Sequence, residues 1–118
     1  MRDLENMRIY KLAVEIGELV WQLVVELDKF SKWTIGKQIT ESADGIGATM
    51  IEGYYRFSKN DQARFFQYAL SSAKETSLWL WKMKNRNLIN DNNFNEIINK
   101  INDLIPQTIS YIKSLKKE

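Results

Sequence analysis

Four amphipathic segments make up this chain, separated by short polar stretches. Within each segment apolar residues recur every three or four positions, which is the helical period, and no stretch alternates in the way a half-buried strand does. The pattern predicts helices over about 4–30, through 39–54, from about 58 to 85, and from 91 towards the end of the chain. Short links between long helices predict up-down-up-down connectivity in one all-α domain spanning residues 1–118.

Turn and capping residues predict where these helices begin and end. We expect the first turn at 31–34, and Gly53 to end the second helix. Ser58 with Asp61 forms a capping-box pattern for the third helix, and Asp91 can cap the fourth. Pro106 lies inside the fourth helix and should kink it or remove one hydrogen bond.

The first and third helices carry more apolar surface than one core face needs. On a helical wheel the apolar arc of the first helix is about 240° wide, whereas one buried face needs about 100°. We expect the additional apolar surface to be buried between copies of the chain. The alternative for the first helix is a central position, covered by the other helices of its own chain. The alternative for the third helix is a thick core filled by bulky side chains. The candidate interface residues are Tyr10, Val14, Trp21, Val25, Phe65, Trp79 and Met83.

Two glycines in the second helix predict a close helix contact. Gly45 and Gly47 each cost about 1 kcal/mol relative to alanine in a helix interior, a loss that a close backbone approach would offset. We therefore expect the tightest helix contact there. The same residues do not form a phosphate-binding loop, because the third glycine of one motif and the Gly-Lys-Ser/Thr of the other are missing.

The composition argues against catalysis. The chain has no histidine and no cysteine, so the commonest general base, metal ligand and nucleophile are absent. A metal site could use only carboxylates such as Glu41, Glu52 and Glu75. The alternative, which we favour, is that Glu52 and Glu75 pair with Arg56 or Arg64 and brace the turn beside Gly53. We therefore expect no catalytic residue, no metal, no cofactor and no small-molecule substrate.

Basic residues gather near the ends of the last two helices, although the formal net charge is only +2. The candidate nucleic-acid-binding residues are Lys82, Lys84, Arg86, Lys113, Lys116 and Lys117. Cations at helix ends also offset the helix dipole, so plain solvated surface is the alternative. The start of the chain lacks a signal-peptide pattern, and carboxylates interrupt its most apolar stretch, so we expect a cytoplasmic protein without a membrane span.

A combination of motifs in the second and third helices resembles the 23S rRNA intervening-sequence protein family. The motif residues are Gln38, Ile46, the run Ile51-Glu52-Gly53-Tyr54 with Arg56, then Ser58, Arg64-Phe65, Ala69, Ser72 and Glu75. The resemblance covers nearly the whole chain. It implies a left-handed four-helix bundle that assembles into a ring, typically a pentamer, with no established enzymatic activity. A distant relative of similar shape binds nucleic acid through a positive surface.

Two functions remain open after this reading. The first is an oligomeric scaffold that binds RNA or DNA backbone through a ring-multiplied basic surface. The alternative is a protein–protein adaptor, or a structural oligomer, without a nucleic-acid role.

Overall fold

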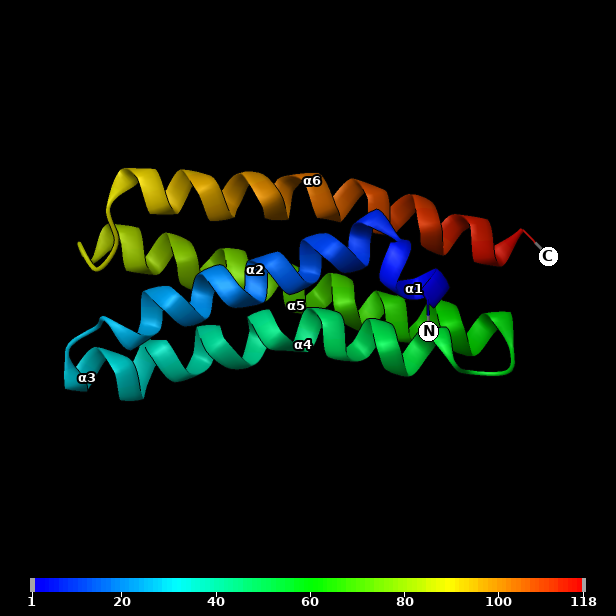
Figure 1. Cartoon of the computed structure of the whole chain (residues 1–118), viewed down its shortest axis with the longest axis horizontal. Helices are drawn as coiled ribbons and strands as arrows, with labels where there is room; N and C mark the ends of the chain where they lie inside the picture. Colours follow the sequence, from blue (N-terminus) through cyan, green and yellow to red (C-terminus); the bar gives the residue numbers. More distant parts are fainter. Residues whose placement is uncertain (1, 118) are drawn as a thin grey trace.

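The computed structural model describes residues 2–117 and contains four long helices in a rod-shaped bundle (Figure 1). The elements in chain order are α1 (Arg2–Asn6), α2 (Arg8–Val25), α3 (Lys29–Ser31), the π-helix η1 (Lys32–Gly36), α4 (Lys37–Tyr54), α5 (Lys59–Asn85) and α6 (Asp91–Lys116). The molecule measures 47 × 22 × 22 Å. No strand occurs within residues 2–117, and the predicted all-α fold class is confirmed.

The four long helices occupy the corners of a square. Each packs on its neighbours in the order α2, α4, α5, α6 and back to α2, so α2 and α5 lie on a diagonal. Consecutive long helices are therefore adjacent, as short links require, and the contacts agree with up-down-up-down connectivity.

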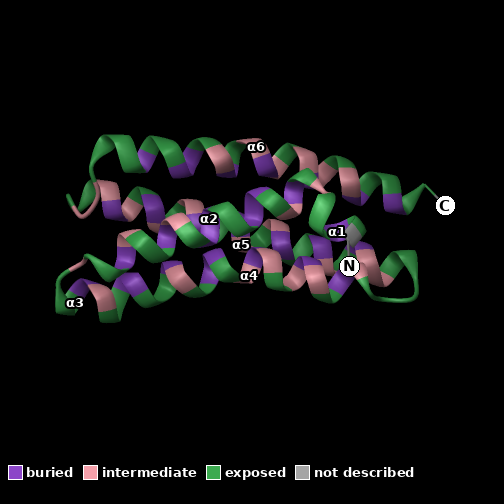
Figure 2. Ribbon diagram, in the orientation of Figure 1, coloured by how far each residue is buried: buried purple, intermediate pink, exposed green. Residues whose placement is uncertain are grey.

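The core is a continuous apolar column to which every long helix contributes its inward stripe (Figure 2). Its largest fully buried side chains include Ile16, Ile46, Phe66 and Leu104, one from each long helix. Two buried hydroxyls, Ser42 and Thr76, lie 2.9 Å apart in hydrogen-bond contact between α4 and α5. Among the described residues, no buried side-chain nitrogen or oxygen lacks a hydrogen-bond partner, so we look for function on the outward surfaces.

The first helix ends earlier than predicted, and this correction changes the surface. It breaks at Met7 and stops at Val25, and the chain turns at 26–28. Asp28 caps the next helix by accepting a hydrogen bond from the Ser31 amide at 3.1 Å. Hydrogen bonds from Ser31 lower the pKa of Asp28. Residues 31–34, where we predicted a turn, are helical instead. The spacing of apolar residues alone does not reveal where one helix ends and a newly capped helix begins.

Glycine supports close packing at positions other than those predicted. A Cβ at Gly53 would lie 2.6 Å from the Phe65 Cβ, and one at Gly17 would lie 2.9 Å from the Asp44 Oδ1. At Gly45 the nearest atom would be 3.3 Å away, and at Gly47 it would be 3.8 Å. The prediction of the tightest contact at Gly45 and Gly47 is therefore wrong. The α4 helix also continues through Gly53 to Tyr54, so Gly53 permits a close approach rather than ending the helix.

The N-cap of α5 was predicted correctly, and the N-cap of α6 was predicted one residue too late. The Ser58 hydroxyl accepts from the Asp61 amide at 3.0 Å, as predicted. The cap of α6 is Asn90, which accepts from the Asn93 amide at 2.7 Å, rather than Asp91. Asn87 adopts a positive φ of 60°. The Leu88 amide then bonds the Met83 carbonyl, which closes α5 in a Schellman motif.

Candidate functional site

The outward side of α2 next to α4 is apolar and uncovered. Val14, Trp21 and Val25 are 45%, 55% and 44% exposed, and Tyr10 is half-buried. We call Tyr10, Val14, Trp21 and Val25 the α2–α4 apolar face. Their spacing places them on one side of the helix, away from the buried stripe of Ile9, Leu12, Ile16 and Val20. Four candidate interface residues thus lie on one surface.

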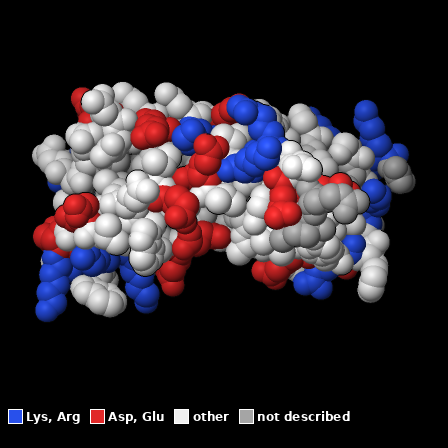
Figure 3. All heavy atoms as spheres, in the orientation of Figure 1, with Lys and Arg blue, Asp and Glu red and all other residues white. Residues whose placement is uncertain are grey.

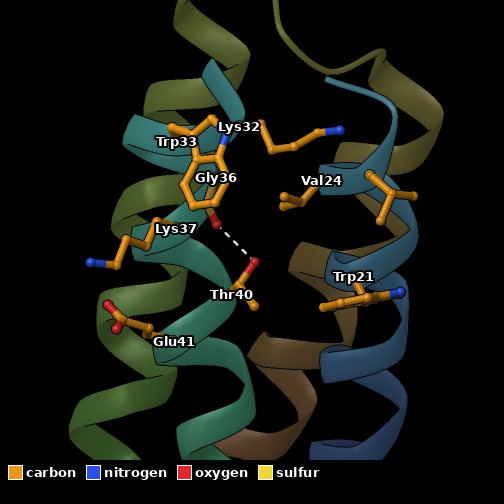
Figure 4. A pocket seen from close by; sticks show the side chains of 9 residues that line it. Trp21, Val24, Lys32, Trp33, Gly36, Lys37, Thr40 and Glu41 are labelled. Carbon is orange, nitrogen blue, oxygen red and sulfur yellow. Dashed lines mark hydrogen bonds between the residues drawn. The ribbon is translucent and has the colours of Figure 1, made fainter. Parts of the chain in front are cut away.

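A groove of about 270 Å³ marks the α3 end of this face (Figure 4). Trp21 and Val24 border it from α2, while Trp33 and Thr40 border it from η1 and α4. Gly36 lets η1 approach α2 closely, because a Cβ there would lie 3.0 Å from Val24 Cγ1. The walls are almost wholly apolar, so the groove extends the α2–α4 apolar face.

The predicted interface residues of α5 divide between surface and core. Phe65 and Trp79 are half-buried on the side of α5 that faces α4. Met83 is fully buried within its own bundle. It was placed on the interface wrongly, since a side chain without exposed surface cannot contact a second copy.

Two carboxylates interrupt the α2–α4 apolar face at its middle. Glu18 and Asp44 both line the hollow between α2 and α4, beside Gly17 and Gly47. Partial burial raises the pKa of Asp44, and the negative charge of Glu18 raises it further. Ionisation of Asp44 is therefore less favourable in the folded chain than in the unfolded chain, and the ionised carboxylate lowers the stability of the fold.

Replacing Asp44 with asparagine should stabilise the fold at neutral pH and not at acid pH. The pKa of Asp44 is higher in the folded chain than in the unfolded chain. The protonated carboxyl group therefore favours the folded state below the ordinary Asp pKa of about 3.9, and this stabilisation is lost as pH rises through the raised pKa of the folded state. Asp44→Asn removes that loss. Urea unfolding from about pH 3 to pH 7 should show a stability gain that grows with pH. Glu18→Gln should reduce the effect, and a gain independent of pH would contradict the assignment.

The residues predicted to brace the α4–α5 turn make other contacts. Arg64 pairs with Asp61 at 3.2 Å, and the Arg56 guanidinium lies over the Phe65 ring at 4.3 Å. Glu75 accepts a hydrogen bond from Trp79 Nε1 at 3.3 Å, and Glu52 forms no ion pair with another described residue. The predicted pairing of Glu52 and Glu75 with Arg56 or Arg64 is wrong, because Arg64 pairs with Asp61 and Arg56 stacks on Phe65 instead. Within residues 2–117 no three carboxylates gather as a metal site.

The two basic clusters lie at opposite ends of the rod. Lys82, Lys84 and Arg86 close α5 at the α3 end, and Lys113, Lys116 and Lys117 lie at the other end (Figure 1). Figure 3 shows acidic side chains across the middle of one face and basic side chains over α3 and η1 and around the C-terminus. The structure therefore does not combine the two predicted clusters into one surface.

The structure brings together a further group at the α3 end that the sequence reading missed. Phe30 and Trp33 are 76% and 69% exposed. With Trp79, Lys37, Gln38 and Arg86 they line a hollow of about 720 Å³, to which Thr34 and Ile35 also contribute. The sequence pattern had placed Phe30 at the end of the first helix and Trp33 in the turn at 31–34. The Asp28 cap was the sequence feature that could have placed both side chains on the surface.

These observations define the protein as an all-α four-helix bundle with an uncovered apolar face beside α2 and basic side chains near both ends. The family model of the 23S rRNA-intervening sequence protein matches residues 5–110, so the chain belongs to that family. No curated protein matches it.

A solved structure supports the same fold. It is the 1.70 Å crystal structure of a protein of unknown function from the S23 ribosomal protein family of Bacteroides thetaiotaomicron VPI-5482. The two superpose with a TM-score of 0.80 at 24% identity, over 89% of this chain and 98% of that chain. At this identity the likeness establishes the fold alone. Among residues 2–117, every helix is too short or too polar to span a bilayer.

Proposed function

We propose that this protein is a non-enzymatic scaffold whose copies shelter the α2–α4 apolar face and assemble into a ring. The observation that carries the proposal is the exposed Val14, Trp21 and Val25 beside an apolar groove. Soluble monomers rarely leave such a contiguous surface bare. A ring uses a heterologous contact, in which this face meets a different surface of the next copy. Five subunits is the number that the family resemblance implies.

Within this proposal the ring binds RNA or DNA backbone through basic surface. Each end of one bundle carries a few lysine and arginine side chains, and a ring repeats them around its axis. Repetition raises the number of phosphates contacted at once, which compensates for a low charge per chain. A role beside RNA fits the family description, and with it we propose that the protein acts in the cytoplasm.

The nucleic-acid part is tested by fluorescence anisotropy with labelled RNA and DNA over a salt series. If about three phosphates are contacted, affinity should fall about 40-fold between 50 and 200 mM salt. Changing Lys82, Lys84 and Arg86 together to glutamine should weaken binding to all sequences and flatten the salt slope. The matched triple change of Lys113, Lys116 and Lys117 to glutamine measures the contribution of the basic cluster at the other end of the rod. Absence of binding at low salt would overturn this part.

The apolar groove beside Trp21 favours a second function. An amphipathic helix from a partner protein could lie in a groove with such walls. An adaptor of this kind would keep the ring, bind no nucleic acid and capture its partner through Trp21 and Trp33. Loss of the salt-dependent signal together with an intact assembly would favour it.

A further inference from the structure

We infer that the hollow formed by Phe30, Trp33, Lys37, Trp79 and Arg86 binds single-stranded nucleic acid, with bases stacked on the exposed rings and phosphates held by the two cations. This inference rests on the nucleic-acid part of the proposed function and assigns it a site. We call this group the aromatic–cationic hollow.

Local structure makes the two rings available. The Asp28 cap starts a new helical turn, and its inward side is taken by Ser31 and Ile35, which are buried. Phe30 and Trp33 consequently point outward, with most of their surface in water. Exposed rings of this size carry a hydrophobic cost in the free protein that a stacked partner would remove.

The charges around the hollow suit an anion. Its lining contains Lys37 and Arg86 and no carboxylate. Neither cation forms an ion pair with a described residue, whereas Arg8, Arg64 and Lys100 are each paired with an acid. Two acids adjoin the lining. Glu75 is bonded to the Trp79 indole N–H at the helix surface, and Glu41 follows Lys37 by one turn of α4 and lines the neighbouring groove, without an ion pair to Lys37. Lys37 and Arg86 are therefore free to meet phosphates.

The combination of rings and cations favours a single strand over a duplex. Paired bases are stacked on each other and cannot cover a tryptophan face, whereas every unpaired base has a free π-face. The hollow of about 720 Å³ is wide and open to solvent rather than enclosed, so an extended chain can lie across it. The lysine and arginine side chains supply the electrostatic part without reading sequence.

The test uses the full chain and a labelled 20-nucleotide oligo-uridine, with a 20-base-pair duplex as comparison. We expect tighter binding of the single strand and quenching of tryptophan fluorescence on binding. The double variant Phe30→Ala, Trp33→Ala should weaken single-strand binding about tenfold or more. Phe57→Ala is the matched control, because Phe57 is fully exposed in the α4–α5 link at the other end of the rod. It should change nothing.

A second variant, Lys37→Gln with Arg86→Gln, keeps the test valid if the aromatic changes disturb folding, since both side chains are exposed. It should weaken binding and lower the salt slope. Normal binding by both double variants overturns the inference while the proposed function stands. If the wild type binds no nucleic acid at low salt, the proposed function fails as well. If instead an acidic peptide binds and the Phe30→Ala, Trp33→Ala change abolishes that binding, the hollow serves a protein partner and the inference is wrong.

Discussion

Changing Trp21 to glutamate is expected to convert the assembly into monomers while leaving the bundle folded. Trp21 is 55% exposed and borders the groove next to η1, so its replacement removes little packing within one chain. In a contact between copies, the change deletes an aromatic anchor and places a charge within the covered apolar surface. Loss of such an anchor costs about 2 kcal/mol or more per interface, and a ring loses it at every contact.

The control for this change is Gln22→Glu. It adds the same charge one residue further along α2, where the side chain lines the α2–α6 side. Circular dichroism should show both variants equally helical, and light scattering should show that only Trp21→Glu is monomeric. Equal dissociation by both variants would mean that net charge, rather than the α2–α4 apolar face, governs assembly. An intact assembly in Trp21→Glu would remove this face from the interface.

Changing Gly53 to alanine is expected to destabilise the bundle more than any other single-methyl addition to its helices. The new Cβ would meet the Phe65 Cβ at 2.6 Å and the Gln62 carbonyl oxygen at 3.3 Å. These atoms belong to or adjoin the backbone of α5, so relief requires α4 and α5 to separate at their turn. Overpacking of this kind costs about 2 kcal/mol, more than the propensity gain from replacing glycine. A melting temperature lower by about 8 °C follows.

Gly47→Ala is the matched control on the same helix. A Cβ there meets only Ala13 and Tyr10 at 3.8 Å, which is ordinary contact, so improved helix propensity should stabilise the chain by up to about 1 kcal/mol. Both substitutions are best compared in the Trp21→Glu background, because assembly otherwise adds to the measured stability. Equal melting temperatures for the two variants would contradict the close approach at Gly53.

Periodicity was sufficient to predict the four helices and most of the core. The stripes through Ile16, Ile46, Phe66 and Ile101 follow the helical period, and each is buried as that period requires. Surplus apolar residues were also informative, since Val14, Trp21 and Val25 lie outside the core. Met83 was misplaced because its position on the wheel lies at the border between the core stripe and the flank.

Features that depend on a single contact were not accessible from the pattern. The turn at 26–28 is closed by local hydrogen bonds, among them the bond from the Ser31 amide to Asp28, and the new helical start leaves Phe30 and Trp33 exposed. Gly53 resembles a helix end in sequence, yet its role is set by Phe65 on another helix. The aromatic–cationic hollow joins residues from α3, η1, α4 and α5, so no local stretch of sequence contains it.

Light scattering on the wild-type chain as it elutes from a sizing column tests the central claim most directly. At high micromolar concentration the account predicts a mass five times the 13.9 kDa of one chain, with the α2–α4 apolar face sheltered by neighbouring copies. A homogeneous 13.9 kDa species at that concentration would contradict it.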